Sequence, residues 1–151
     1  MGLNIQDLAL SSPDIENLGA IAPRFAADTG NETPRLVIAG VPEGAVELAV
    51  VLHDPDAPLP QGFTHWTVYG IDPGTTELGG TVEAGRVGPN GMGEVAYSGP
   101  QPPFGHGLHH YYFWVYALNR KVDGAPSREE FLASYADAIV EQNRFVGTYQ
   151  R

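Results

Sequence analysis

Apolar residues recur along the chain in short runs that glycine and proline interrupt, which is the pattern of strands joined by turns. Two such runs, residues 35–41 (RLVIAGV) and 45–54 (AVELAVVLHD), flank the turn Pro42-Glu43-Gly44. Both faces of the second run are apolar, so we expect that strand to lie at the centre of a β-sandwich. Residues 65–71 (HWTVYGI) and 109–119 (HHYYFWVYALN) are predicted as two further strands.

In the C-terminal region the apolar residues recur with a different spacing. Ser127 and Glu130 have the spacing of a capping box, in which each side chain bonds the other residue's backbone N–H. Apolar residues then recur at helical spacing: Phe131, Leu132, Tyr135, Ala138 and Ile139. We therefore predict one amphipathic helix near 128–142 on a mostly β body, in a region that ends at Gly147. The glycine-rich segment 79–94 is predicted as a surface loop or weak edge structure.

Length and charge narrow the class of protein. A chain of 151 residues favours a single domain, 1–151. The formal net charge of −10 argues against nucleic acid and anionic membrane surfaces as partners. No apolar run approaches the roughly 20 residues of a membrane span, so no membrane insertion is expected. The first residues lack the basic and apolar regions of a signal peptide and cysteine is absent, which together predict a cytoplasmic protein.

Three polar sites can carry chemistry. The first is HDPDAP (53–58), in which Asp54 and Asp56 flank a proline after the apolar strand. Asp-Pro-Asp is also good turn chemistry, because aspartate side chains bond nearby backbone N–H groups. The second is His65, which strand alternation places on the face opposite Trp66. A histidine at the start of a strand can equally be structural, so neither site decides the function by itself.

The third site opens the last predicted strand. Alternation puts His109, Tyr111 and Phe113 on one face and His110, Tyr112 and Trp114 on the other. His109 and Tyr111 can therefore serve one pocket. The preceding loop contains glycines that allow close backbone approach and prolines that stiffen it. We predict that this loop forms the rim of the pocket.

Metal binding is the rival interpretation of these residues. Enough candidate ligands are present: His53, Asp54, Asp56, His65, His106, His109 and His110. However, His109 and His110 project to opposite faces of a strand, and no diagnostic zinc spacing occurs. Neither a G-x-S-x-G nucleophile elbow nor a phosphate-binding P-loop is present. No metal and no cofactor are predicted.

The three sites together resemble the phosphatidylethanolamine-binding protein family, which includes the Raf kinase inhibitor proteins. The likeness rests on DPDAP (54–58), on HW (65–66) before an apolar strand, and on GPQPPFGHGLHHYYF (99–113). It extends through GNETPRL (30–36) and VGTY (146–149), and the bacterial branch is the best match. The resemblance implies an antiparallel β-sandwich with short flanking helices and a C-terminal helix.

The resemblance also implies a pocket for small anions or phosphate-bearing groups. Carried over residue by residue, the ligand-binding positions are Asp54, His65, Gly99, Pro102, His109 and Tyr111. By the same resemblance, Asp56 corresponds to an aspartate that stabilises the turn. A histidine beside Asp54 is expected to be held in orientation and to stay protonated near neutral pH.

The sequence departs from the family pattern at two positions, one in the loop that forms the pocket rim and one in a predicted strand. Phe104 stands where many eukaryotic members have lysine, and Gly70 replaces the usual asparagine. With the acidic net charge, Phe104 also favours a less charged organic ligand.

We expect a small-ligand-binding protein that modulates a partner protein, as a monomer or a homodimer. The alternatives are an enzyme, an acid/base isomerase or cyclase that uses Asp54 with His65 as its acid/base pair, and an inhibitor of a kinase or protease.

Overall fold

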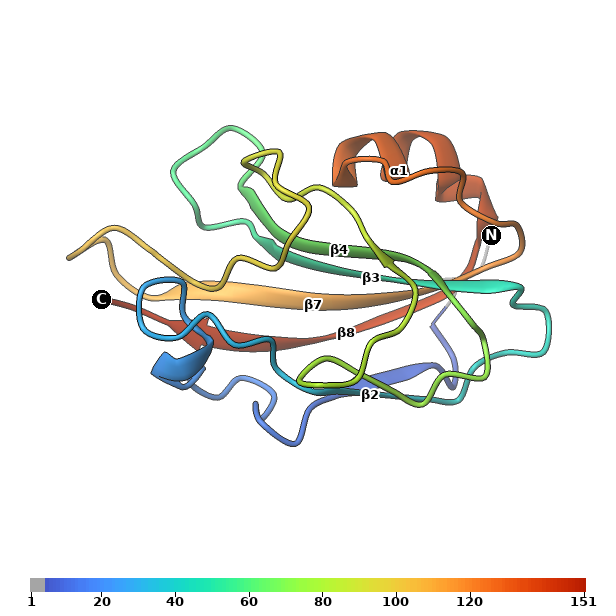
Figure 1. The fold of residues 1–151 in the computed structure, drawn as a ribbon, viewed down its shortest axis with the longest axis horizontal. Helices are drawn as coiled ribbons and strands as arrows, with labels where there is room; N and C mark the ends of the chain where they lie inside the picture. Colours follow the sequence, from blue (N-terminus) through green and yellow to red (C-terminus); the bar gives the residue numbers. More distant parts are fainter. Residues whose placement is uncertain (1–4) are drawn as a thin grey trace.

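The computed structural model describes residues 5–151, so the first four residues of the predicted domain lie outside the described part. Its named strands form two antiparallel sheets (Figure 1). The larger sheet has the order β6 (Arg86–Val87), β4 (Phe63–Ile71), β3 (Glu47–Asp54), β7 (His109–Leu118), β8 (Ile139–Tyr149). The smaller sheet has the order β1 (Ala9–Ser11), β2 (Leu36–Ala39), β5 (Glu77–Leu78). The predicted antiparallel β-sandwich is confirmed.

The larger sheet is covered on both faces. Its inner face packs against the smaller sheet, and its outer face packs under the helix α1 (Arg128–Tyr135) (Figure 1). Every residue of β3 is buried, as the two-faced apolar pattern of that strand predicted. Two 3-10 turns, η1 (Pro23–Phe25) and η2 (Ala136–Ala138), complete the short helical elements.

The C-terminal helix begins as predicted and ends earlier. Ser127 and Glu130 form the capping box. The predicted end at 142 is wrong, because α1 stops at Tyr135 and the chain enters β8 at Ile139. Pairing along almost the whole length of β7 outweighs the short helical period here, since strand preference depends on the neighbouring strand. Gly147, expected to end the helical region, lies inside β8.

Strand β4 contains an irregularity at Gly70. Leu48 lies opposite Ile71 whereas Val50 lies opposite Val68, so β4 has one extra residue in between. Gly70 has a φ of 67°, a left-handed conformation that glycine adopts without strain. Its N–H donates to the buried Glu47 carboxylate at 3.1 Å, which holds the bulge in place.

The loops that carry the polar sites meet at one end of the sandwich. Figure 1 shows the β3–β4 connection and the long segment before β7 at the end where the C-terminus lies. Because β3 and β7 are hydrogen-bonded neighbours, Asp54 at the end of β3 and His109 at the start of β7 are brought to the same place.

Candidate functional site

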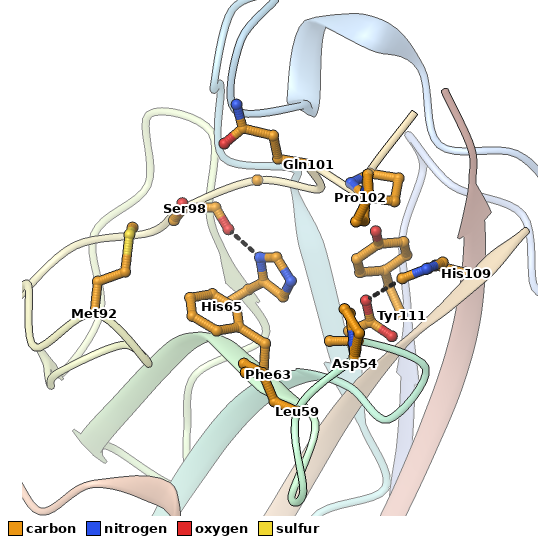
Figure 2. Close-up of a pocket in the computed structure, with 14 residues that line it drawn as sticks. Asp54, Leu59, Phe63, His65, Met92, Ser98, Gln101, Pro102, His109 and Tyr111 are labelled. Carbon is orange, nitrogen blue, oxygen red and sulfur yellow. Dashed lines mark hydrogen bonds and ion pairs between the residues drawn. The ribbon is translucent and has the colours of Figure 1, made fainter. Parts of the chain in front are cut away.

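A cavity of about 290 Å³ opens at this end of the sandwich (Figure 2). All six predicted ligand-binding residues line it: Asp54, His65, Gly99, Pro102, His109 and Tyr111. The rest of the wall is largely apolar and includes Leu59, Phe63, Met92 and Pro103. The structure therefore brings together, in one partly enclosed space, polar residues that lie up to 57 positions apart in the chain (111 − 54).

Asp54 and His109 form a buried hydrogen bond beside the cavity. His109 Nδ1 lies 2.7 Å from Asp54 Oδ2, and the two side chains are 2% and 3% exposed. A carboxylate only accepts hydrogen bonds, so Nδ1 of His109 carries the proton and donates it. The other oxygen of Asp54 accepts from the backbone N–H of Asp56 at 2.7 Å. Asp54 thus orients His109 and shapes the turn at the same time.

Asp56 joins the turn to the neighbouring strand. Its Oδ2 accepts from the backbone N–H of His110 and lies equally close, 2.7 Å, to Nδ1 of that residue. This contact lies on the outer side of β7, away from the cavity, because His110 alternates with the inward-facing His109. The turn-stabilising part that the family resemblance implies for Asp56 fits this geometry.

A β-bulge brings His65 into the cavity. Leu52 lies opposite Trp66 and His53 lies opposite Thr64, so His65 is the extra residue of β4 at this point. The ring of His65 packs edge-on against Tyr111, with 5.3 Å between the ring centres. The prediction from simple alternation, which put His65 on the face opposite Trp66, is therefore wrong. Bulges of this kind re-aim side chains near functional sites.

One ring nitrogen of His65 is held by a backbone carbonyl group. Its Nδ1 lies 2.7 Å from the carbonyl oxygen of Ser98, which only accepts, so Nδ1 carries the proton. Figure 2 shows the other ring nitrogen on the side that faces Asp54 and Tyr111. Burial lowers the pKa of His65 and outweighs the opposing effect of the Asp54 charge. The lowered pKa favours the neutral ring of His65, in which Nε2 carries the lone pair.

Tyr111 supplies a hydroxyl group with no partner. The residue is 0% exposed, and its oxygen has no hydrogen-bond partner within residues 5–151. Burial raises the pKa of Tyr111, so the hydroxyl keeps its proton. A buried hydroxyl without a partner costs free energy, and such a group in a native structure requires an explanation. A ligand that accepts a hydrogen bond in the cavity would satisfy it.

The family model for phosphatidylethanolamine-binding proteins matches residues 11–150. The chain belongs to this family. The UPF0098 protein of Methanothermobacter thermautotrophicus is 37% identical over 142 residues, covering 88% of this chain and 92% of that protein. The solved structure of Escherichia coli YbcL, described as a member of the mammalian PEBP family, is 28% identical with a TM-score of 0.88. That match covers 97% of this chain and 99% of YbcL.

A relative from Mycobacterium tuberculosis, LppC, bears on location. It is 37% identical over 149 residues, covering 96% of this chain and 73% of that protein, and its name proposes a lipoprotein. The helices described within residues 5–151 are all too short or too polar to cross a bilayer. The cytoplasmic location of this family member stays a prediction.

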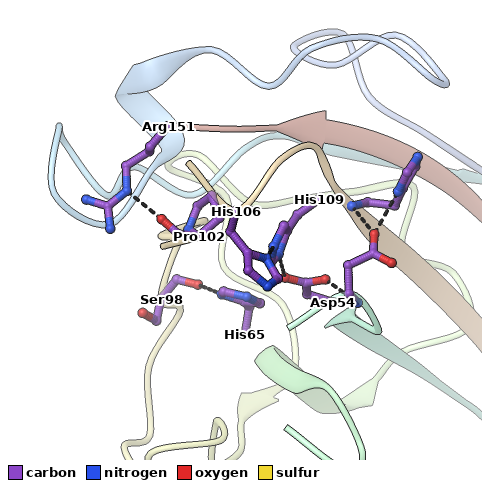
Figure 3. Close-up of polar contacts among 9 residues, drawn as sticks. Asp54, His65, Ser98, Pro102, His106, His109 and Arg151 are labelled. Carbon is purple, nitrogen blue, oxygen red and sulfur yellow. Dashed lines mark hydrogen bonds and ion pairs between the residues drawn. The ribbon is translucent and has the colours of Figure 1, made fainter. Parts of the chain in front are cut away.

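The cavity rim depends on contacts that the sequence did not reveal. Gly99 donates its N–H to the Asn31 side chain at 2.7 Å, and a Cβ on Gly99 would lie 1.9 Å from the Phe25 carbonyl oxygen. The C-terminal Arg151 donates from Nε to the Pro102 carbonyl oxygen at 2.7 Å (Figure 3). Asn31 lies in the GNETPRL segment of the family likeness, but the sequence assigned no role to Asn31 or Arg151, because both act through contacts distant in sequence.

The candidate metal ligands are divided between the two faces of the sheet. His53 points to the outer face, where its Nδ1 lies 3.1 Å from the Thr64 hydroxyl, and His110 is paired with Asp56. His106, which sequence reasoning considered only as a ligand to metal, contacts His109 instead: Nδ1 of His106 lies 2.6 Å from Nε2 of His109 (Figure 3).

Proposed function

We propose that this member of the phosphatidylethanolamine-binding protein family binds a small molecule with a phosphate or another anionic group in this cavity. The observation that carries the proposal is the buried hydroxyl of Tyr111, a residue that lines the cavity, because this hydroxyl has no partner in residues 5–151. His65 adds a second group, because its Nε2 can accept from a ligand hydroxyl or, once protonated, donate to an anion. Modulation of a partner protein stays a prediction.

The apolar wall suits the rest of such a molecule. Leu59 and Met92 are 54% and 57% exposed at the cavity, and Phe63 lies beside His65 with 4.8 Å between ring centres. A volume of about 290 Å³ is at the lower end for ligand pockets. The cavity therefore suits a compact headgroup or small organic acid.

A second candidate is an enzyme that uses the same residues for proton transfer. It is favoured by the lone pair on His65, because a neutral imidazole facing a partly apolar cavity is suited to act as a general base. The earlier expectation paired Asp54 with His65 as acid and base. The geometry assigns Asp54 to His109 instead, which leaves His65 as the base and Tyr111 as the hydrogen-bond donor.

Titration calorimetry with phosphate, acetate and phosphoethanolamine tests the binding function. We expect saturable binding by the wild-type protein and about tenfold weaker binding by Tyr111→Phe, which loses one hydrogen bond to the ligand. Tyr69→Phe is the matched control, since Tyr69 is also a fully buried tyrosine but packs under α1 and does not line the cavity. Equal affinities for wild type and Tyr111→Phe would reject the assigned site. No binding of any of the three anions would reject the function.

A further inference from the structure

Three side chains form a hydrogen-bonded chain that leads from the cavity to the surface. Asp54 Oδ2 lies 2.7 Å from His109 Nδ1, and His109 Nε2 lies 2.6 Å from His106 Nδ1 (Figure 3). Asp54 and His109 are buried, whereas His106 is exposed. His106 does not line the cavity, although His109 does. It therefore reaches the site only through His109.

The protons in this chain can be placed. Because Asp54 accepts, the proton of a neutral His109 is on Nδ1 and its Nε2 carries a lone pair. That lone pair can only accept from His106, so Nδ1 of His106 carries the proton there. The remaining lone pair is on Nε2 of His106, the exposed residue at the outer end of this series of hydrogen bonds.

The cavity needs a source of positive charge if an anion is to enter it. Of the described residues that line it, none is lysine or arginine. Arg151 is the nearby guanidinium, and it is bound to the Asp28 carboxylate at 2.9 Å and to the Pro102 carbonyl oxygen. Burying an anion without a compensating charge is costly. A proton taken up by the site itself would supply that charge.

We propose that His106 is a positioning residue through which the pocket takes up one proton when an anion binds, an inference that rests on the proposed function. A proton from solvent bonds to Nε2 of His106, and the proton on Nδ1 of His106 passes to Nε2 of His109. His109 becomes an imidazolium between two acceptors, the Asp54 carboxylate and the lone pair on His106 Nδ1. One proton enters from solvent, no other bond changes, and the wall of the cavity gains one positive charge.

The backbone holds His106 in place for this role. The His106 N–H donates to the Pro103 carbonyl oxygen at 3.1 Å, and the Gly105 N–H donates to the Arg151 carbonyl oxygen at 3.1 Å. The rings of His106 and His109 meet edge-on with 4.9 Å between their centres. The loop is thus tied to the C-terminal residue, and the exposed imidazole is fixed against the buried one.

The other titratable groups around this chain come from several elements. His65 on β4 and Tyr111 on β7 face the same cavity, while Asp56 and His110 form their own pair on the outer side. Asp28 is paired with Arg151, and Tyr149 on β8 lies opposite His109 in the register. His65 can itself gain a proton when an anion binds, so the experiment must separate its effect from that of His106.

The experiment measures sulfate binding by calorimetry at about pH 8.5 and about pH 6, on either side of the ordinary range in which histidine titrates. Sulfate remains a dianion throughout, so every proton taken up belongs to the protein. Two buffers of different ionisation enthalpy give the number of protons per bound sulfate. His106→Phe keeps a ring against His109 without nitrogen atoms. His110→Phe is the matched control on the outer face, where the side chain is 43% exposed.

We expect the affinity of the wild type to rise as the pH falls. His106→Phe should bind like wild type at the higher pH and about tenfold more weakly at the lower pH, with fewer protons taken up, because the imidazolium has lost a charge-assisted hydrogen bond. The smaller increase in sulfate affinity that His106→Phe still shows at the lower pH is attributed to protonation of His65. His110→Phe should follow the wild type. His106→Gln, whose amide oxygen can accept from His109, should restore part of the lost affinity.

Two results would overturn the proposal: an unchanged pH dependence in His106→Phe, or an equal loss of affinity at both pH values, which is the mark of a purely structural role. If wild type binds no sulfate at either pH, the proposed function is still judged by the calorimetry with phosphate, acetate and phosphoethanolamine. The relay is then decided in the free protein by ring ¹⁵N spectra. An imidazolium at His109 at the lower pH in wild type but not in His106→Phe supports it, and identical spectra reject it.

Discussion

Replacing Tyr111 by phenylalanine should stabilise the ligand-free protein. The hydroxyl is fully buried and has no partner within residues 5–151, and the substitution removes it while the ring remains. A buried polar group without a hydrogen bond costs about 1–3 kcal/mol. Because Tyr111 lines a cavity of about 290 Å³ and is not surrounded entirely by closely packed side chains, we take the low end of that range. The expected gain in the free energy of unfolding is about 1 kcal/mol.

The opposite result is expected at Tyr97, a tyrosine of similar burial. Its hydroxyl donates to the Phe25 carbonyl oxygen at 2.8 Å. Tyr97→Phe deletes that bond and leaves a buried carbonyl oxygen without this donor, so we expect a loss of about 1–2 kcal/mol. Tyr69→Phe should gain less stability than Tyr111→Phe, because the buried Tyr69 hydroxyl lies within hydrogen-bonding reach of the Thr67 side chain.

Urea denaturation of the three variants provides the assay, with the change in midpoint read at constant slope. We expect Tyr111→Phe to gain stability, to bind phosphate more weakly, and to change stability in the opposite direction from Tyr97→Phe. A loss of stability in Tyr111→Phe as large as that in Tyr97→Phe would refute the reasoning. It would mean that the Tyr111 hydroxyl already has a partner in the folded, ligand-free protein.

Three further predictions concern binding, acid stability and the β4 bulge. His65→Ala should weaken phosphate binding by about 1.5–3 kcal/mol in calorimetry, and unchanged affinity would remove His65 from the site. Burial lowers the pKa of His53 from 6.5 to about 4, so the unfolded chain binds protons first and stability falls as the pH drops from 6.5 towards 4. His53→Gln should reduce this loss in urea titrations, and an equal loss in both proteins would contradict it. Gly70→Ala should cost about 1–2 kcal/mol because φ is 67°. Gly44→Ala, where an added Cβ meets no atom within 4 Å, should change stability by less than about 0.5 kcal/mol, and similar losses at both positions would count against strain at the bulge.

Much of the fold follows from local patterns in the sequence. The two apolar faces of β3 predicted its central place, and the capping box predicted where α1 begins, because both signals depend on the immediate neighbours. The end of α1 could not be predicted in this way. Polar residues interrupt the apolar alternation of β8, and its identity as a strand depends on pairing with β7.

The sequence predicted which residues form the site better than it predicted how their side chains are arranged. Alternation correctly placed His109 and Tyr111 on one buried face. It failed at His65, because a bulge depends on the pairing of two strands and leaves no clear mark on one strand alone. The partners of the rim, Arg151 with Pro102 and His106 with His109, could be found only once the loop had been folded against the C-terminus.

The most direct test of the central claim, that this cavity binds an anionic group, is an NMR titration of the histidine ring signals with phosphoethanolamine. We expect saturable shifts of the His65 and His109 signals, because both residues line the cavity. We expect no shift for His53, which points to the outer face of the sheet. Tyr111→Phe should need a higher concentration for the same shifts. Signals of His65 and His109 that stay unchanged at saturating phosphoethanolamine would contradict the claim.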